Sequence, residues 1–358
     1  MPDVITDVNQ MTPELLTEVL QATGTLPQGR VMTIEPQGLF YPTFTSTIVR
    51  LEVCYSADAP PSAPSHFLLK MSRPEAHSDV LADLGRPEVA FYTTISPAMS
   101  DSPAVDCYHA LYIPDTRQFH ILLADVSETH EQTEWPLPGT YPTCIQSVEC
   151  LARFHAYWWD HPHLGTEIIS RPSEFALQGP FSDLQERCTA FVNFLGDRLS
   201  PERRAVYDRV LAAWPALANR LTTGRDVTIV HGDAHMWNFL YPRGSPTDTA
   251  CLVDWQLWHI SVGASDLAYM MALHWYPDRR AALEQPLLRH YHHCLQEHGL
   301  RTYSWEACWR DYQWSAVRNL LLPVIQWAAK IPAAGWWPHL ERAMLAFEDL
   351  DGDSLLKS

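Results

Sequence analysis

Residues 231–238 have the sequence His-Gly-Asp-Ala-His-Met-Trp-Asn, and a further acidic residue, Asp254, follows sixteen positions after Asn238. Four residues separate Asp233 from Asn238, and Asp254 comes directly after the apolar run 250–253. Phosphoryl transfer requires a carboxylate that orients an attacking hydroxyl and accepts its proton, together with oxygen ligands for magnesium. Asp233, Asn238 and Asp254 supply these groups, so the stretch predicts a phosphoryl-transfer site.

The sequence around this loop predicts the strands that hold it. Residues 226–230 are rich in β-branched side chains and predict a strand entering the loop, and 238–241 predict a strand leaving it. The segment 242–248 has the proline, glycine and serine content of a hairpin turn, and 250–253 predict the returning strand. Such a hairpin would bring the acidic residue after the last strand back beside the loop. The competing interpretation, a simple turn after a strand, leaves the second acidic residue unexplained.

The loop and two later segments resemble a known family. The spacing Asp-x4-Asn is that of protein-kinase catalytic loops, although Gly232 stands where those enzymes carry arginine. With Val-Asp-Trp-Gln at 253–256 and Gly-Ala-Ser-Asp-Leu-Ala at 263–268, the chain is similar to the aminoglycoside phosphotransferase and choline kinase superfamily, and more so to its ecdysteroid-kinase-like branch. The resemblance implies an α+β, two-lobed protein-kinase-like fold, with an antiparallel sheet and a helix in the N-terminal lobe. The C-terminal lobe would be mainly helical and carry the catalytic-loop hairpin. It also implies that Asp266 braces this loop and that His231 is structural near the site.

The N-terminal part has the order of elements that such a lobe requires. A threonine followed by proline predicts a helix over 13–22. Residues 43–55 and 66–71 have the β-branched and aromatic content of strands, and 107–112 with 119–123 predict a hairpin pair. The N-terminal part of the sequence therefore predicts a sheet with helices beside it.

Lys70 and Glu88 are the residues predicted to position the nucleotide. Lys70 lies at the end of the strand 66–71, and Pro87 opens a helix that carries Glu88. The ammonium group would contact the α- and β-phosphates, and the glutamate would hold the lysine in place. A lysine that extends into solvent and a glutamate favoured in a first helical turn are the alternatives. The family pattern of a lysine followed by Glu-x-x-Phe-Tyr favours the functional interpretation.

The phosphate loop departs from the kinase pattern. A kinase covers the phosphates with a glycine-rich loop whose amide groups approach the anion, but Gly38 is the only glycine in 37–46. The resembled branch also has a degenerate loop, with a hydroxyl residue near the position of Thr45 or Ser46. The resemblance therefore implies that these hydroxyls contact the nucleotide.

The division into lobes follows from a change of composition. Residues 125–143 contain a polar, proline-containing stretch, after which the pattern becomes helical. We expect a nucleotide-binding lobe over 1–124, a connecting segment over 125–143, and a catalytic and substrate-binding lobe over 144–358. Ala124 and Val126 resemble the family's connection between lobes, where backbone groups bind a purine.

Tryptophans are concentrated in the C-terminal half, where nine of the fourteen lie between positions 255 and 337. In the resembled family, helices of the C-terminal lobe wall the acceptor pocket, and aromatic faces there can bind ammonium groups or sugars. Trp336 and Trp337 lie between Gly335 and Pro338, which predicts a loop and a substrate-facing pair. His235 in the catalytic loop is a further predicted substrate contact. For any single tryptophan, core packing is the alternative.

Composition limits the partners. The chain has 358 residues, 46% hydrophobic content and a formal net charge of −17, which suits a globular protein with more than one core. Nucleic acids and anionic membranes require a basic footprint, so neither is expected as a partner. The sequence has no signal-like N-terminus and no apolar run of membrane-spanning length, so we expect a cytoplasmic protein. The oligomeric state does not follow from the sequence.

Together these features predict a phosphotransferase that uses ATP or GTP with Mg²⁺ and modifies a hydroxyl of a small molecule. Asp233 would be the base, and Asn238 and Asp254 would hold the metal. An amino sugar, an amino alcohol, a sterol or a polyol would be the acceptor. A sensor that binds nucleotide without catalysis is the alternative, favoured by the degenerate loop and disfavoured by the complete set of catalytic residues. A protein kinase is disfavoured because the arginine before Asp233 is missing.

Overall fold

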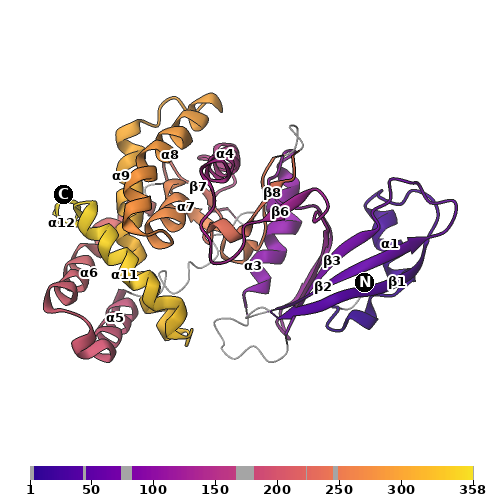
Figure 1. Cartoon of the computed structure of the whole chain (residues 1–358), viewed down its shortest axis with the longest axis horizontal. Helices are drawn as coiled ribbons and strands as arrows, with labels where there is room; N and C mark the ends of the chain where they lie inside the picture. The colour runs from indigo at the N-terminus through magenta and orange to yellow at the C-terminus, as the bar shows by residue number, and fades with distance from the viewer. Residues whose placement is uncertain are drawn as a thin grey trace. The chain divides into compact units, whose positions relative to one another are not determined.

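The computed structural model describes residues 4–42, 46–73, 83–166, 181–222, 224–244 and 249–357. The chain forms two compact units, which we call the first and the second unit (Figure 1). The first unit comprises Met1–Glu131 and Pro242–Gln256, and the second comprises Gln132–Tyr241 and Leu257–Ser358. The chain first passes between the units inside the predicted connecting segment 125–143, and the predicted lobe boundaries themselves stay a prediction.

The first unit is built on a five-stranded antiparallel sheet with the strand order β1-β2-β3-β5-β4. Its strands are β1 Val31–Pro42, β2 Ser46–Tyr55, β3 His66–Ser72, β4 Cys107–Ile113 and β5 Gln118–Ala124. Inward-facing apolar residues from the central strands form the core together with helix α1, Pro13–Ala22, which lies beside the sheet (Figure 1). Helix α1 has the predicted bounds, because Thr12 caps the amide of Leu15 and Pro13 occupies the first helical position.

Helix α3, Gly85–Ala90, packs against β5 and continues into a π-helical turn, Phe91–Ile95. A glycine is required where the helix meets the strand, since a Cβ atom on Gly85 would lie 1.9 Å from a ring carbon of Phe119. This close approach places the first turn of α3 directly against β5.

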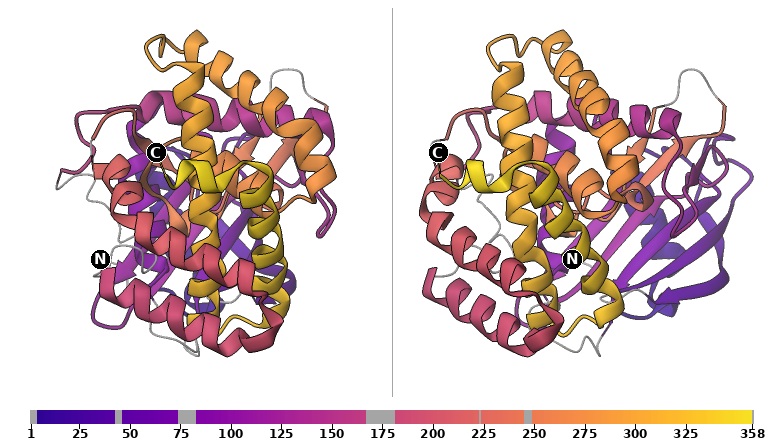
Figure 2. Two further views of the ribbon diagram at one scale, coloured as in Figure 1. Left: turned by 90° about the vertical axis from the view of Figure 1, so that its left-hand side faces the viewer. Right: turned by 60° about the vertical axis from the view of Figure 1, so that its left-hand side comes forward.

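The second unit is mainly helical. Its longer helices are α4 Tyr141–Trp158, α5 Phe181–Leu195, α6 Pro201–Thr222, α8 Pro277–Glu297, α9 Trp305–Arg318 and α11 Ala333–Asp349. Helices α7 Ala264–Ala268, α10 Leu322–Ala328 and α12 Gly352–Leu355 are shorter. Helices α5 and α6 lie side by side (Figure 2), and their apolar faces share one core with α10 and α11. The prediction of a mainly helical C-terminal part is confirmed.

Short strands and turns frame the catalytic loop. Strand β7, Thr228–Val230, pairs antiparallel with β10, His259–Ser261, within the second unit. A 3-10 turn, Met236–Asn238, closes the loop that follows β7. The remaining strands are β6 His130–Gln132, β8 Phe239–Pro242 and β9 Cys251–Leu252, and a further turn spans Trp255–Leu257.

The prediction of a loop at Trp336 and Trp337 is wrong. Both residues lie in α11, and Trp336 is 4% exposed in a core where its ring meets that of Phe191 at 5.4 Å. Burial of these large rings outweighs the low helix propensity of the neighbouring glycine and proline, which lie within the first two turns of the helix.

In the described part of the chain, no helix combines the length and the apolar content that crossing a bilayer requires.

Candidate active site

Lys70 lies between two carboxylates in the first unit. Its Nζ atom is 2.8 Å from an oxygen of Glu88 and 2.6 Å from Oδ1 of Asp254. Burial acts to lower the pKa of Lys70, but the charges of Asp254 and Glu88 outweigh it, and the pKa lies above its ordinary value. The lysine is therefore charged over the physiological pH range.

The predicted pairing of Lys70 with Glu88 is confirmed. Lys70 points from the middle of the sheet on β3 and Glu88 from the first turn of α3, and their side chains are only 8% and 1% exposed. This burial excludes the alternative of a lysine that extends into solvent. Burial raises the pKa of Glu88, against the lowering effect of the lysine. Each charge is thus held by its partner, because an unpaired charge at this depth would be strongly disfavoured.

Asp254 is presented by a strained turn. Its φ of 67° lies in the left-handed region, which is uncommon for residues other than glycine. The following Trp255 stacks on Phe91 at 3.8 Å with an interplanar angle of 8°, which holds the turn against the π-helical turn that follows α3. The side chain of Asp254 is 33% exposed, so solvent reaches its carboxylate beside the buried lysine. The sequence did not reveal the contact between Lys70 and Asp254, because the two residues are 184 positions apart.

Part of the predicted phosphate loop belongs to strands in the structure. Gly38 belongs to β1, and Ser46 opens β2 as a fully buried residue. Thr45 lies outside the described residues. A role of Ser46 or Thr45 at the nucleotide stays a prediction.

Of Ala124 and Val126, the two residues predicted to bind a purine through their backbone, only one has an amide without a partner in the described part of the chain. The amide of Ala124 donates to the carbonyl of Asp106 at 2.9 Å, and the carbonyl of Val126 accepts from the amides of Thr129 and His130. The amide of Val126 has no hydrogen-bond partner within the described ranges. Of the two predicted residues, Val126 therefore has the N–H group that a purine could use.

In the second unit, both carboxylate oxygens of Asp233 meet donors. The Tyr269 hydroxyl donates to Oδ1 at 2.5 Å, and Nδ2 of Asn238 donates to Oδ2 at 3.2 Å and to the Asp233 carbonyl at 2.8 Å. Nε2 of His235 lies 3.7 Å from Oδ2. These contacts hold the carboxylate in one orientation at the end of the loop. The sequence did not reveal Tyr269, which comes from the π-helical turn Tyr269–Leu273.

Asp266 braces the catalytic loop by accepting hydrogen bonds from its backbone, as the resemblance implied. Its carboxylate accepts the amide of His231 at 2.7 Å and the amide of Gly232 at 2.9 Å. Nε2 of His155 lies 3.2 Å from the same group, and the other ring nitrogen meets the Tyr291 hydroxyl at 2.8 Å. Burial acts to raise the pKa of Asp266, but these hydrogen bonds and the charge of His155 lower it below its ordinary value.

The loop needs its glycine and its buried histidine. Gly232 has a φ of 79°, and a Cβ atom there would lie 2.2 Å from the carbonyl oxygen of Leu257. His231 is fully buried, and its Nδ1 accepts the amide of Asp233 at 3.2 Å. Both residues therefore shape the backbone that carries Asp233.

We expect Asp266→Ala to lower the free energy of unfolding by about 3 kcal/mol, because two backbone donors and a buried imidazole lose their acceptor. Chemical denaturation followed by circular dichroism measures this. The control is Asp278→Ala, an exposed residue in the first turn of α8, where about 0.5 kcal/mol is expected. Equal losses in the two variants would contradict the brace.

The brace also predicts a pH dependence. Because the pKa of Asp266 is lower in the folded than in the unfolded chain, its contribution is complete above the unfolded value of about 3.9. It is lost as the pH falls through the folded value. The stability difference between the wild type and Asp266→Ala should therefore shrink in acid, and a constant difference would contradict this assignment.

Trp336, one of the predicted substrate-facing pair, is less accessible to a substrate than His235 of the catalytic loop. Trp336 is a core residue, and Trp337 is half-buried against the same core. His235, in contrast, lies next to Asp233 with 21% of its side chain exposed. These exposed fractions favour a substrate contact at His235 over one at Trp336.

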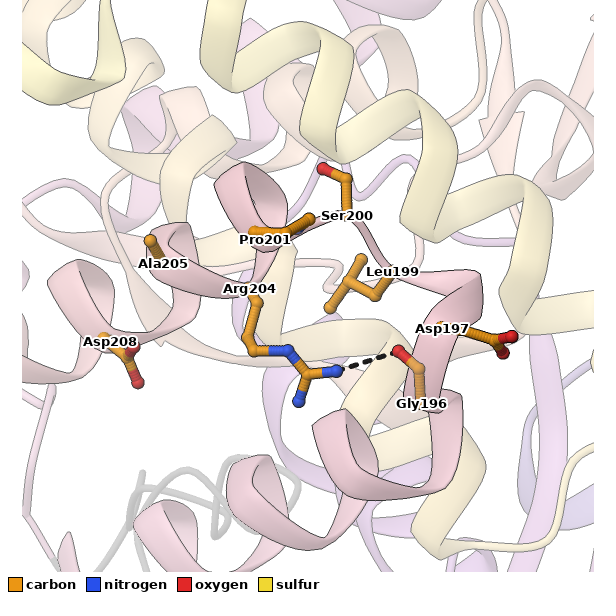
Figure 3. A pocket seen from close by; sticks show the side chains of 8 residues that line it. All are labelled: Gly196, Asp197, Leu199, Ser200, Pro201, Arg204, Ala205 and Asp208. Atoms are coloured by element: carbon orange, nitrogen blue, oxygen red, sulfur yellow. Dashed lines mark hydrogen bonds between the residues drawn. The ribbon is translucent and has the colours of Figure 1, made fainter.

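A surface depression of about 430 Å³ is lined by the turn Gly196–Arg198 and the first turns of α6 (Figure 3). Arg204 lines this depression and donates a hydrogen bond of 2.8 Å to the carbonyl of Gly196. Its lining includes none of the predicted site residues. We assign it no part in catalysis.

The residues thus form two groups, one within each unit. Lys70, Glu88 and Asp254 form the group of the first unit, and Asp233 with Asn238 that of the second. The predicted convergence of Asp254 with Asp233 stays a prediction.

Comparison with known proteins adds a family and a fold. The profile of the phosphotransferase enzyme family matches residues 99–306, a range that contains the catalytic loop and Asp254. No curated protein matches the chain in sequence.

Solved structures share the fold at low sequence identity. Choline kinase from Streptococcus pneumoniae is similar with a TM-score of 0.51 and 14% identity over 95% of this chain and 98% of that one. The GDP complex of an aminoglycoside 2'-phosphotransferase gives 0.51 and 13% over 96% and 100%. An amicoumacin kinase solved with AMP-PNP and Ca²⁺ gives 0.54 and 15% over 94% and 93%. These likenesses confirm the predicted α+β, protein-kinase-like fold.

Proposed function

The chain belongs to the phosphotransferase enzyme family, and from this premise we propose that it transfers the terminal phosphoryl group of ATP or GTP to a hydroxyl of a small molecule. The observation that carries the proposal is the buried Lys70, held between Glu88 and Asp254. A lysine with two carboxylate partners and a partly exposed acid beside it is arranged to meet a polyphosphate and its metal. Burying the charges of Lys70 and Glu88 costs desolvation energy, and a site that binds a polyphosphate explains this cost.

The donor side of the reaction uses the first unit. Lys70 would bind the phosphates of the nucleotide, and Glu88 would keep the ammonium group in place during binding. The free amide of Val126 would bind the purine. Support comes from the kinases of the same fold that were solved with GDP or with AMP-PNP. The choice between ATP and GTP is open to direct measurement.

The donor set suits magnesium. Mg²⁺ prefers oxygen ligands and keeps several waters, and the Asp254 carboxylate is partly exposed. The amide nitrogen of Asn238 is used by Asp233, which leaves its amide oxygen as the metal-facing atom. When bound, the metal would neutralise the charge of the polyphosphate.

On the acceptor side, Asp233 would bind the reacting hydroxyl and take its proton as the bond to phosphorus forms. The fixed carboxylate orients that hydroxyl, and Tyr269 with Asn238 limits the rotation of the carboxylate. Catalysis in this reaction class is largely positioning and electrostatics. The donors around Asp233 therefore contribute to the rate without touching the nucleotide.

We expect Tyr269→Phe to lower kcat about 10-fold and to leave the affinity for nucleotide unchanged, because the variant loses only the hydroxyl that orients Asp233. Steady-state kinetics with the acceptor and nucleotide varied separately measure both quantities. Tyr312→Phe is the matched control, since this buried phenol also donates to a carboxylate, Glu284, at 3.0 Å. An equal loss of kcat in both variants would show a general effect on stability.

The activity is tested by screening acceptors for magnesium-dependent release of ADP or GDP. The panel should contain amino sugars, amino alcohols, sterols, polyols and hydroxy acids. Release that depends on both an acceptor and Mg²⁺ supports the proposal. Tight nucleotide binding without transfer to any acceptor would instead support the rival function, a sensor that binds nucleotide. We expect the enzyme to act in the cytoplasm on free metabolites or drugs.

A further inference from the structure

An ion pair joins strand β2 to the segment that follows β5 in the first unit. Arg50 lies in the middle of β2, and its Nε atom donates to Oδ2 of Asp125, the first residue after β5. The side chain of Asp125 is 3% exposed and that of Arg50 is 38% exposed. A pair between two exposed side chains contributes little, but a carboxylate at this depth depends on its partner.

Asp125 also bonds to the backbone that follows it. Its Oδ1 accepts the amide of Ser127 at 2.9 Å, which is the hydrogen bond of an Asx turn. Burial acts to raise the pKa of Asp125, but the hydrogen bonds from Ser127 and Arg50 and the charge of Arg50 lower it below its ordinary value. The carboxylate is therefore charged at pH 7, and each of its two oxygens has a fixed donor.

Val126 is the residue enclosed by this turn. Its carbonyl accepts the amides of Thr129 and His130 at 3.0 and 2.8 Å, and the Thr129 hydroxyl at 3.2 Å. Its amide has no hydrogen-bond partner among the residues that the structure describes. The contacts on either side fix the backbone of 125–127, so the direction of the Val126 N–H group is set before a ligand binds.

The strand register places Arg50 on the same face of the sheet as Lys70. Arg50 lies opposite Leu68 on β3, and Lys70 lies two residues further along that strand. The residues between and beside them, Phe67, Leu69 and Met71, belong to the core on the other face. The pair between Arg50 and Asp125 therefore lies on the face of the sheet that carries the proposed phosphate contact.

A purely stabilising ion pair explains these contacts less well. Glu52 is the next residue of β2 on the face of Arg50, but it accepts a hydrogen bond from Gln37 instead. Arg50 pairs with the more distant Asp125, whose carboxylate also holds the backbone beside Val126. The pair thus acts on the one segment of this unit that offers a free amide to a purine.

We propose that Arg50 acts through Asp125 as a positioning residue for the nucleobase, by keeping the amide of Val126 directed at a hydrogen-bond acceptor on the purine edge. The inference rests on the proposed function, because it takes Val126 as the purine contact. Arg50 touches no reacting atom in this arrangement. Without Arg50, the buried carboxylate of Asp125 would turn toward solvent and release the amide of Ser127.

The test uses nucleotides that differ by one acceptor atom at the purine edge. N1 and N7 are the edge acceptors of adenine, and O6 and N7 those of guanine. The analogues 1-deaza-ATP, 7-deaza-ATP, 7-deaza-GTP and 2-aminopurine riboside triphosphate each lack one of these atoms. Calorimetry with Mg²⁺ measures the binding of ATP, GTP and the analogues. For the preferred purine we expect one analogue to bind about 10-fold more weakly than the natural nucleotide, which corresponds to about 1.4 kcal/mol.

Variants assign this contact to the ion pair. Arg50→Gln should lower the affinity for the natural nucleotide about 10-fold and leave that for the weak analogue unchanged, because the analogue already lacks the contact. Arg50→Lys keeps a cation beside Asp125 and should recover part of the loss. Asp125→Asn should lose as much as Arg50→Gln, and the double variant no more than either, since both changes break one pair. The KM for the nucleotide should rise while kcat stays unchanged.

Arg203→Gln is the matched control for the loss of an arginine. Arg203 also donates to a carboxylate, that of Glu341 at 2.8 Å, in the second unit, and we expect wild-type affinities from its variant. Thermal unfolding of each variant shows whether the fold is retained. Equal losses of affinity in Arg203→Gln and Arg50→Gln would show a general effect and overturn the inference.

The remaining outcomes separate this inference from the function on which it rests. An equal loss for the natural nucleotides and all analogues in Arg50→Gln overturns the inference, because Arg50 would then contact the ribose or the phosphates itself. Wild-type affinity in Arg50→Gln, or equal binding of all the nucleotides by the wild type, overturns it and leaves the phosphotransferase intact. The selective loss in a protein that transfers phosphate to no acceptor supports the inference and contradicts the proposed activity. A wild type that binds no nucleotide contradicts both.

Discussion

Asp233→Ala will lower kcat by about 10³-fold and leave nucleotide binding nearly unchanged, because general-base catalysis by a positioned side chain contributes roughly 10²- to 10⁴-fold. The carboxylate is the one group of the loop that both Tyr269 and Asn238 orient. Its loss removes the acceptor for the substrate proton and the anchor for the hydroxyl. Single-turnover assays with saturating nucleotide measure the chemical step directly.

The controls for this variant separate chemistry from folding. Asp208→Ala changes an exposed aspartate of α6 that lines the surface depression of Figure 3, and we expect wild-type rates from it. Calorimetric titration with nucleotide shows whether the donor site of Asp233→Ala is intact. Rates near those of the wild type in Asp233→Ala would remove the residue from the catalytic role.

Part of the geometry around Lys70 and the catalytic loop could be predicted because it follows from local sequence patterns. Pro87 indicated a helix start and placed Glu88 in a first helical turn, and the apolar strand before it carries Lys70. The catalytic loop was recognised from spacing alone, and its aspartate brace from resemblance. In α3 and in the loop a few neighbouring residues fix the backbone. The brace lies 35 positions from His231 and was expected only from the resemblance.

The contacts that the sequence did not reveal join distant segments. Tyr269 reaches Asp233 from 36 positions away, and Tyr291 reaches His155 from 136. Nothing in the local sequence of a tyrosine indicates which carboxylate or imidazole it will meet, because tertiary packing decides that. The error at Trp336 has the same origin, since core packing outweighed the local signal of glycine and proline.

Asp254→Ala will lower the affinity for nucleotide in the presence of Mg²⁺ by at least about 100-fold, because a metal site loses one of its few protein oxygen ligands. The affinity measured with EDTA should change little, since Lys70 and Glu88 remain. The variant also removes the charge 2.6 Å from Lys70, so the pKa of this lysine moves down from its raised value. Calorimetry with and without Mg²⁺ measures the two affinities.

The loss of nucleotide affinity with Mg²⁺ must be compared with the loss in EDTA. This comparison distinguishes a metal ligand from a residue that only holds Lys70 in position. If Asp254 merely held the lysine, both affinities would fall together. Asp115→Ala, in the exposed turn between β4 and β5 of the same unit, controls for a general loss of acidic charge and should bind like the wild type. Unchanged magnesium-dependent affinity in Asp254→Ala would contradict the assignment of this carboxylate to the metal. It would also contradict the proposal that the buried lysine binds the phosphates while the partly exposed acid binds their metal.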